Sequence, residues 1–310
     1  MSKDNPLVSV VIITYNSVST IIETLESIKQ QTYRKIELII SDDCSTDNTR
    51  DVCNEWIDSN ADRFVKCKLV ISSVNTGVAP NINRGLRECS GEWIKVLGAD
   101  DLFMSNAVSD VMSFATLEMD IIVSQYYPFI QNGNERILQE IHPTAKLDIF
   151  YKEKNAHIRQ KLVLTNFIDA TIGYFIRKSV LDKIGGYDEE YPMMEDVPMF
   201  LKLTYSGYRF HLLEKPCFLY RIAESITHPS NERVYSVRFK ESSLKFHRNV
   251  TNKLIPWWNI IHHQSYWMAY IQFHLIVKFA HNRNNRLARF IKTVIYYLTI
   301  DSYVKMIKGY

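Results

Sequence analysis

The strongest constraint on the fold is the alternation of strand-like and helix-like segments through the first hundred residues. A largely β-branched run from Val8 to Thr14 predicts a strand that is buried on both faces. The helix-like and strand-like segments that follow occupy residues 20–31, 36–41, 47–60, 68–72, 80–89 and 93–97. Strands and helices in this order predict a parallel sheet with helices on its faces. Thr20 and Glu23 form a capping-box pattern at the start of the first helix.

Three polar clusters follow the strands of this predicted sheet. They are Thr14-Tyr15-Asn16, Asp42-Asp43 and Asp100-Asp101. Because open α/β sheets bind ligands in the crevice outside the carboxyl ends of their strands, we expect the clusters to lie at one edge. A carboxylate beside an aromatic ring, such as Asp43 beside Tyr15, can hold a nucleobase. Paired carboxylates such as Asp100-Asp101 suit a hard divalent cation that shares its oxygen ligands with phosphate.

A further acidic pair, Glu195-Asp196, precedes a helix-like segment at residues 199–206. A carboxylate can take the proton of an attacking hydroxyl, so Asp196 is a candidate general base. Pro198 is expected to delay the start of the helix. Each acidic pair also has a structural interpretation, because aspartates frequently cap turns and helices.

Five short segments occur in a fixed order along the chain. They are Ser9 to Asn16, Ser41 to Asp47, Asn75 to Gly77, Gly98 to Asp101, and Glu195-Asp196. Each segment alone is a weak signal, but in this order they resemble the second family of glycosyltransferases over roughly residues 6 to 228. The resemblance implies an α/β architecture of the GT-A type, a Rossmann-like mixed sheet flanked by helices that binds nucleotide-diphosphate sugars, here with a C-terminal helical extension.

The resemblance also implies roles for individual residues. Those that would contact the nucleotide sugar are Thr14, Tyr15, Asn16, Asp43, Asp100 and Arg221. Asp101 would bind a divalent cation, Mn²⁺ or Mg²⁺, and Asp196 would be the general base of an inverting transfer. His228 is a candidate for completing the metal shell, although a lone loop histidine more often faces solvent.

The implied reaction is transfer of a hexose or N-acetylhexosamine from a UDP-sugar to an acceptor hydroxyl, with a β linkage formed. Family members of this build extend bacterial surface polysaccharides, so a polyprenyl-diphosphate-linked oligosaccharide of O-antigen or capsular type is the expected acceptor. Two alternatives stay open: a nucleotidyltransferase, and a non-catalytic nucleotide-sugar-binding protein of the same fold. The first would need a glycine-rich basic loop after the first strand, which residues 16–19 do not provide.

We expect residues 1–225 to form the catalytic domain, with a nucleotide-binding half at 1–105 and an acceptor half at 106–225. Residues 226–310 are expected to be helical, amphipathic and basic. Net charge is +3 for the chain, but residues 278–310 alone carry +6 and the remainder −3. Trp257-Trp258 and His262-His263 are interpreted as packing or interface residues.

A basic amphipathic helix is predicted near the C-terminus. Its apolar residues at helical spacing are Leu287, Phe290, Ile291, Val294, Ile295 and Leu298. Its basic flank consists of Arg286, Arg289 and Lys292. Such a helix can lie on the inner leaflet of an anionic membrane, or it can pack on the catalytic domain or on a second subunit.

The five cysteines are scattered and show no metal-binding spacing, which favours reduced thiols in a cytosolic protein. No apolar run reaches the roughly 18 to 20 residues of a spanning helix, and the N-terminal run is short for a signal peptide. We therefore expect a cytoplasmic protein, peripheral on the inner face of the bacterial plasma membrane, with no nucleic-acid partner. A homodimer is left open.

Overall fold

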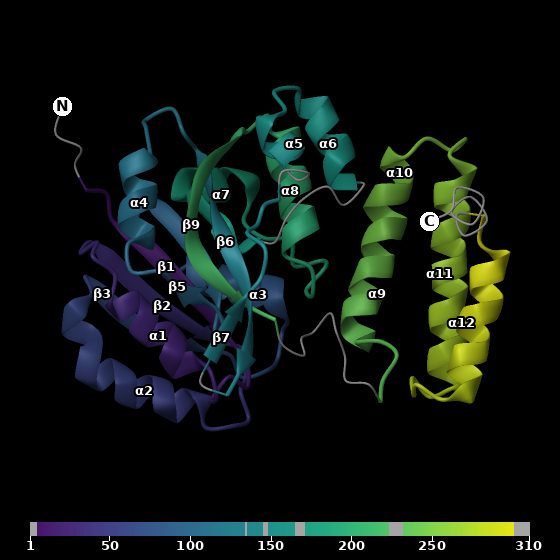
Figure 1. Ribbon diagram of the computed structural model, residues 1–310, viewed down its shortest axis with the longest axis horizontal. Helices are drawn as coiled ribbons and strands as arrows, with labels where there is room; N and C mark the ends of the chain where they lie inside the picture. Colours follow the sequence, from purple (N-terminus) through teal and green to yellow (C-terminus); the bar gives the residue numbers. More distant parts are fainter. Residues whose placement is uncertain (1–4, 134, 145–147, 165–170, 223–231, 301–310) are drawn as a thin grey trace. The chain divides into compact units, whose positions relative to one another are not determined.

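The computed structural model describes residues 5–133, 135–144, 148–164, 171–222 and 232–300. The chain divides into two compact units, Met1–Ile222 and Ala223–Tyr310, and Figure 1 shows the elements of each. The boundary expected after residue 225 lies outside the described residues.

One mixed sheet organises the first unit. Among the described residues it has nine strands in the order β3-β2-β1-β4-β8-β6-β9-β5, with β7 attached to β6. The strands are β1 (Val8–Thr14), β2 (Ile36–Asp42), β3 (Lys66–Ile71), β4 (Trp93–Gly98), β5 (Leu102–Phe103), β6 (Ile121–Asn132), β7 (Glu135–Leu138), β8 (Tyr174–Arg177) and β9 (Phe210–Arg221). Strands β1 to β4 are parallel, as predicted, whereas β8 runs antiparallel to both β4 and β6.

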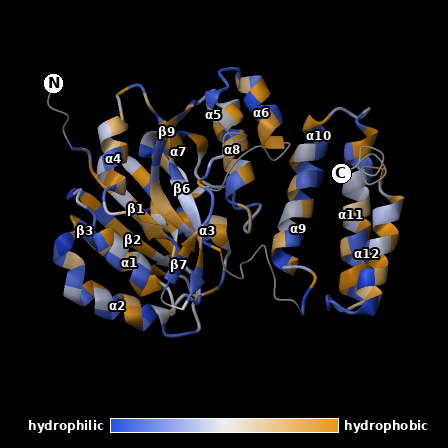
Figure 2. Cartoon of the chain, in the orientation of Figure 1, coloured by the Kyte–Doolittle hydropathy of each residue, from blue (hydrophilic) through white to orange (hydrophobic). Residues whose placement is uncertain are grey.

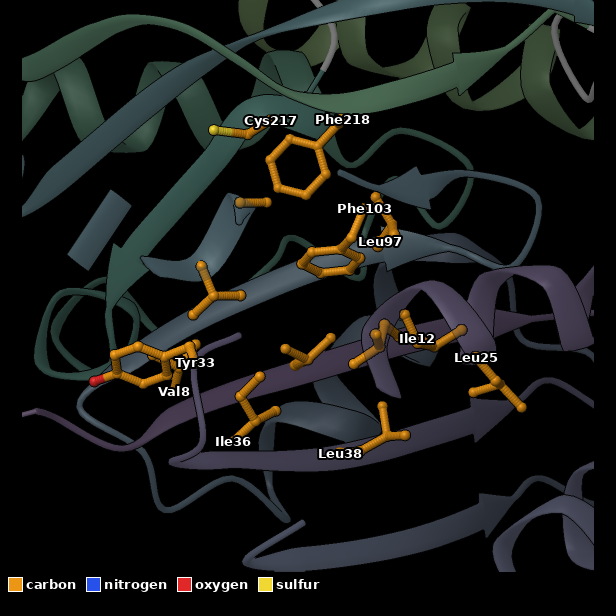
Figure 3. Packing of buried hydrophobic residues seen from close by; sticks show 14 of the residues in the cluster. Val8, Ile12, Leu25, Tyr33, Ile36, Leu38, Leu97, Phe103, Cys217 and Phe218 are labelled. Carbon is orange, nitrogen blue, oxygen red and sulfur yellow. The ribbon is translucent and has the colours of Figure 1, made fainter. Parts of the chain in front are cut away.

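Helices cover both faces of the parallel part of the sheet. The helices of this unit are α1 (Ile21–Lys29), α2 (Thr49–Asn60), α3 (Val78–Leu86), α4 (Ala107–Phe114), α5 (Asp148–Lys152), α6 (Ala156–Leu164), α7 (Lys178–Ile184) and α8 (Asp196–Tyr205). Side chains of α1, α2 and α4 form one core with alternate residues of the strands, including Ile12, Leu38 and Leu97 (Figure 3). Helix α3 packs on the other face, where a Cβ on Gly85 would lie 2.4 Å from Cγ1 of Val11.

Two predictions about helix starts were wrong. Thr20 precedes α1 but makes no side-chain cap. Its hydroxyl donates instead to the carbonyl of Ser17 at 3.4 Å, while Glu23 pairs with Arg136 and Arg221. A carboxylate engaged by two guanidinium groups is not available to cap the helix. Pro198 does not delay α8, since the helix already begins at Asp196 and its first-turn N–H groups need no intrahelical partner.

The second unit contains α9 (Val237–Phe246), α10 (Asn252–Leu254), α11 (Ile260–Phe279) and α12 (Arg286–Leu298), with a π-helical turn at His247–Thr251. Helices α11 and α12 form a hairpin whose interior includes Ile276, Ile291 and Ile295. Two of the six residues of the predicted apolar stripe of α12, Ile291 and Ile295, are thus used in packing, and the other four, Leu287, Phe290, Val294 and Leu298, remain exposed. None of the helices in the described part of the chain is both long and apolar enough to cross a bilayer.

Candidate active site

The carboxyl ends of β1, β2 and β4 bring the three polar clusters of the sequence to one edge of the sheet. In the parallel register, Thr14 lies opposite Asp42 and Ile13 lies opposite Gly98. The N–H of Asp43 donates to the carbonyl oxygen of Thr14 at 3.0 Å, which ties the segments after β1 and β2 together. The clusters that follow these strands therefore start from adjacent positions.

Asp43 is buried and holds the turn at the start of α3. Its Oδ1 accepts hydrogen bonds from the N–H (3.0 Å) and the hydroxyl (2.6 Å) of Thr76, and its Oδ2 accepts from the N–H of Gly77 at 2.7 Å. Gly77 has φ +105°, and a Cβ there would lie 2.7 Å from the carbonyl oxygen of Pro192, so the turn requires glycine. Because Oδ2 accepts one bond from the described residues, it retains capacity for another donor.

Arg84 completes this arrangement, and the sequence reasoning missed it. Its guanidinium pairs with Asp43 at 3.2 Å and donates to the hydroxyl of Thr76 at 2.9 Å and to Oδ1 of Asn81 at 2.8 Å. A usable signal existed, because Arg84 stands seven residues after Gly77 and positions i and i+7 share a helix face.

Asp42 and Asn16 shape the loops around the site. Oδ1 of Asp42 accepts from the N–H of Ser45 at 3.0 Å and from Nε of Arg50 at 2.7 Å. The amide oxygen of Asn16 accepts from the N–H of Thr46 at 2.8 Å, and Asn16 has φ +52°. The side chain of Asp42 is hydrogen-bonded within the chain, which fits the interpretation of Asp42 as a turn residue. The side chain of Asn16 is hydrogen-bonded to the segment after β2, so it can hold the adjacent Tyr15 in position.

Thr14 and Tyr15 offer two kinds of contact. The ring of Tyr15 is 47% exposed, so one face can stack on a planar ligand. Thr14 is buried, and its hydroxyl has no hydrogen-bond partner among the described residues. A buried hydroxyl left unpaired costs about 1–3 kcal/mol. This atom is therefore a candidate for contact with a bound ligand.

Arg221, the last residue of β9, clamps the Asp100-Asp101 loop. Its backbone N–H donates to Oδ1 of Asp101 at 2.9 Å, and its Nε donates to the carbonyl oxygen of Asp100 at 2.9 Å. The guanidinium also pairs with Glu23 and lies 4.7 Å from the ring centroid of Phe129. The side chain is only 9% exposed, which suits a residue that supports the loop.

The two carboxylates of this loop disfavour each other's charge. Burial and the charge of Asp100 raise the pKa of Asp101 well above its ordinary value, against the opposing effects of Arg221 and Lys95. Asp100 is itself exposed, and partial desolvation by the surrounding chain raises its pKa. Excess negative charge of this kind is relieved by a bound cation.

Lys95 is a second residue that the sequence reasoning missed, although a lysine inside the apolar run at residues 93–97 was a visible signal. It is fully buried, and its Nζ donates to the carbonyl of Ile172 and lies 4.1 Å from the ring centroid of Phe218. Burial lowers the pKa of Lys95 to about 7, while the nearby charge of Asp101 acts in the opposite direction.

Asp196 is the first residue of α8 and stands beside Glu195. Burial raises the pKa of Asp196, and a hydrogen bond from the N–H of Val197 at 2.6 Å opposes this effect. Burial and the charge of Asp196 raise the pKa of Glu195. Two coupled carboxyls titrate as a pair, so one of them can hold a proton well above the usual range of carboxylic acids.

Helix α3 links the segment that leads to Asp196 with the loop that contains Asp43. The side-chain amide of Asn83 exchanges two hydrogen bonds with the backbone of Tyr187, each 2.9 Å long. The N–H of Ala79 donates to the carbonyl oxygen of Pro192 at 3.1 Å. Within the described residues, no hydrogen bond or ion pair joins Asp196 to the Asp100-Asp101 pair.

Asp100 and Asp101 fit a divalent cation as a partial set of ligands. In the described part of the chain, no group of three or more His, Cys, Asp or Glu side chains is arranged to hold a metal ion. Two hard carboxylates at one strand end still match a cation whose remaining ligands come from a diphosphate and water. His228, the other predicted ligand, lies outside the described residues.

The chain is similar in sequence to known proteins. The family model described as Glycosyl transferase family 2 matches residues 9–185, more than half of the chain. The Escherichia coli enzyme WfaP, a UDP-Glc:α-D-GlcNAc-diphosphoundecaprenol β-1,3-glucosyltransferase, is 37% identical over 122 residues, which cover 39% of this chain and 46% of WfaP. The chain therefore spans less than half of the length of WfaP.

Solved structures show the same fold. TarS 1-349 of S. aureus in complex with UDP-GlcNAc superposes with a TM-score of 0.59 at 20% identity, covering 87% of this chain and 72% of TarS. The mannosyltransferase PcManGT of Pyrobaculum calidifontis, in complex with GDP-Man and Mn²⁺, gives a TM-score of 0.53 at 18% identity and covers 98% and 79% of the two chains. The expected GT-A fold is confirmed, and with the match over residues 9–185 the chain belongs to family 2 of the glycosyl transferases.

Proposed function

We propose that the chain transfers a hexose or N-acetylhexosamine from a UDP-sugar to an acceptor hydroxyl, and that an α-linked donor gives a β-linked product. The observation that carries the proposal is the arrangement around α3. This helix supports Asp43 through Gly77 and Arg84, and it also binds the segment that leads to Asp196. A nucleotide-binding loop and a candidate base are thus held by one rigid element.

The uracil ring is proposed to stack on Tyr15 and to donate its N3–H to Oδ2 of Asp43. Support comes from the exposed Tyr15 ring and from the remaining acceptor capacity of Oδ2. The other contacts of Asp43 fix its carboxylate before the nucleotide binds, which lowers the entropic cost of binding. Thr14 is proposed to contribute its unpaired hydroxyl, and Asp100 to bind the ribose.

Asp101 is proposed to hold a divalent cation, Mn²⁺ or Mg²⁺. When bound, the cation would neutralise the charge that develops on the departing diphosphate. The raised pKa values of Asp100 and Asp101 support this proposal, because a cation favours the ionised form of both groups. The contacts of Arg221 with this loop favour a positioning role over direct contact with the diphosphate.

Asp196 is proposed to accept the proton of the acceptor hydroxyl while that oxygen attacks the anomeric carbon. A general base works best when its pKa lies near the operating pH, and burial moves the pKa of Asp196 in that direction. A single displacement of this kind inverts the anomeric configuration. One base on the acceptor side is sufficient for it, and no covalent intermediate is involved.

The acceptor is proposed to be a polyprenyl-diphosphate-linked oligosaccharide of O-antigen or capsular type. Support comes from the name of WfaP, which specifies a diphosphoundecaprenol acceptor. A lipid-linked acceptor lies at the membrane surface, so we also propose a cytoplasmic enzyme that is peripheral on the inner leaflet.

Thermal unfolding with nucleotides tests the donor assignment. UDP with Mn²⁺ is expected to raise the melting temperature, since a ligand of the native state stabilises it by mass action. UDP with a chelator is expected to give a smaller shift, and GDP or CMP with Mn²⁺ little or none. An equal shift with all nucleotides would refute the uracil contacts. In the same assay, Arg84→Ala removes the guanidinium that pairs with Asp43, and Arg87→Ala, at an exposed position of the same region, is its control.

A further inference from the structure

The second unit exposes large apolar side chains on two helices. On α11 they are Ile260, Trp267 and Ile271, and on α12 they are Phe290, Val294 and Leu298. Trp267 is 55% and Phe290 66% exposed, which is high for aromatic side chains within helices. We call these six residues the docking face.

The six residues lie on one side of the hairpin. Ile260, Trp267 and Ile271 are spaced seven and four residues apart, and Phe290, Val294 and Leu298 four and four, so each set forms a stripe along its helix. Gln264 lies one turn after Ile260, and its side chain donates to the carbonyl oxygen of Leu298 at 2.7 Å. This bond joins the two stripes across the hairpin.

The other faces of α11 are already used for packing. Ile276 of α11 packs with Ala288, Ile291 and Ile295 of α12 in the hairpin interior. On a different side, Tyr266 and Phe273 of α11 pack with Leu244 of α9. The docking face therefore takes no part in the two hydrophobic cores of this unit. Figure 2 shows hydrophobic residues on both helices.

Two tryptophans precede this surface at the start of α11. Trp257 is 82% and Trp258 66% exposed, and their ring centroids lie 5.9 Å apart. Both rings are thus largely exposed in the described part of the chain, so we interpret these two tryptophans as interface residues. Tryptophan concentrates at the interface between membrane and water, where its ring is shielded while its N–H stays hydrated.

The second unit carries a net positive charge. Residues 223–310 contain 13 basic and four acidic side chains, a net charge of +9, which leaves −6 for residues 1–222. Lys278, Arg283 and Arg286 are exposed at the closed end of the hairpin. None of the three forms an ion pair with a carboxylate among the described residues. Exposed basic residues near an anionic bilayer are attracted to its surface.

We propose that the docking face binds the surface of an anionic lipid bilayer, with Trp257 and Trp258 at the headgroup level and the basic end of the hairpin on the lipid phosphates. The net charge of +9 on residues 223–310 disfavours association of this face with the same face of a second copy, because like charges would repel. This proposal rests on the proposed function in one respect, because docking would bring the active site to a lipid-linked acceptor. The proposed membrane-binding surface includes residues of α11 in addition to α12.

Vesicle co-sedimentation of the full chain tests the docking face. The test variant is Trp267→Glu/Phe290→Glu, and the matched control is Leu117→Glu/Tyr296→Glu, which changes two exposed residues off the face and has the same net charge. Wild type and control are expected to bind phosphatidylglycerol vesicles, and the test variant to bind at least about tenfold more weakly. Phosphatidylcholine vesicles are expected to bind none of them strongly.

Equal vesicle binding by the test and control variants would refute lipid binding through the docking face, whether both variants still bind or both lose binding. Light scattering without lipid supplies a second outcome: a wild-type dimer that the test variant makes monomeric would assign the face to self-association and overturn lipid binding. Quenching of tryptophan fluorescence by brominated lipid is expected in the wild type. Transfer to a soluble acceptor is measured separately, and retention of that activity by the test variant distinguishes failure of docking from failure of the proposed chemistry.

Discussion

At the scale of single residues, Asp101, the proposed metal ligand, carries a charge that lowers the stability of the folded chain. Burial and Asp100 raise its pKa, so the folded chain binds its proton more tightly than the unfolded chain does. The free energy of unfolding of the metal-free protein is then expected to fall as pH rises above about 4, the ordinary pKa of aspartate. The loss continues until pH passes the raised value.

Replacing Asp101 should therefore separate stability from activity. Asp101→Asn is expected to raise the melting temperature in excess chelator at neutral pH by about 2–4 °C, because the neutral amide still accepts the bond from Arg221. The same variant is expected to lose at least about 100-fold in transfer rate. Calorimetry and a transfer assay measure the two effects, and a lower melting temperature would show that the carboxylate is a structural element.

Asp196 makes the second residue-scale prediction. Asp196→Asn is expected to lower kcat by about 100-fold or more while the Kd of UDP changes less than about threefold, since a base acts on the acceptor proton. The acid limb of the wild-type pH profile is expected above the usual range of aspartate, because burial raises this pKa. Glu195→Gln is the neighbouring control. Collapse of UDP binding in Asp196→Asn would identify it as a structural residue or metal ligand.

At the scale of elements, α3 makes a prediction of its own. Asn83→Ala removes the bonds to Tyr187 and leaves the pair between Arg84 and Asp43 in place. It is expected to lower kcat with little change in UDP affinity, whereas Arg84→Ala is expected to weaken UDP binding by about tenfold. Titration calorimetry and steady-state kinetics on both variants would show the split. Identical effects of both changes would contradict the account of α3 as a link between two sites.

The end of β9 supplies the next prediction. Arg221→Met leaves Glu23 paired with Arg136 alone among the described residues, and it removes the side-chain bond to the loop of Asp100. The expected loss is about 2 kcal/mol in the free energy of unfolding, less than for a fully buried pair because Glu23 is partly exposed. Denaturant unfolding measures this loss. An unchanged midpoint would show that the contacts of Arg221 with Glu23 and with the Asp100-Asp101 loop do not stabilise the fold.

Particular elements show what the sequence could and could not predict. The four parallel strands were predictable because each contains a short, mainly apolar segment and helix-like segments separate them along the chain. The partners of Glu23 were not, since Arg136 and Arg221 are more than a hundred residues away in the chain. Cys44 has a φ of +69°, in the region that favours Gly or Asn, and a cysteine at this position gives no sign of that conformation.

At the scale of the whole molecule, charge is divided between the two units, with −6 on residues 1–222 and +9 on residues 223–310. Binding to anionic vesicles is therefore expected to weaken by at least about tenfold between 0.05 and 0.5 M NaCl, because salt screens exposed charges. Transfer to a soluble acceptor is expected to be much less sensitive to salt. Parallel sedimentation and transfer assays across this range provide the check, and salt-independent sedimentation would contradict the electrostatic part of docking.

Inversion, metal dependence and the use of a UDP-sugar can all be tested in one transfer assay. Each UDP-hexose and UDP-N-acetylhexosamine is supplied with a soluble analogue of a polyprenyl-diphosphate acceptor, with Mn²⁺ or with excess chelator, and the product is analysed by NMR. A β-linked product from an α-linked donor is expected in Mn²⁺, and its loss is expected both in chelator and in Asp101→Asn. Full-rate transfer in excess chelator would rule out metal dependence, and an α-linked product from that donor would rule out inversion.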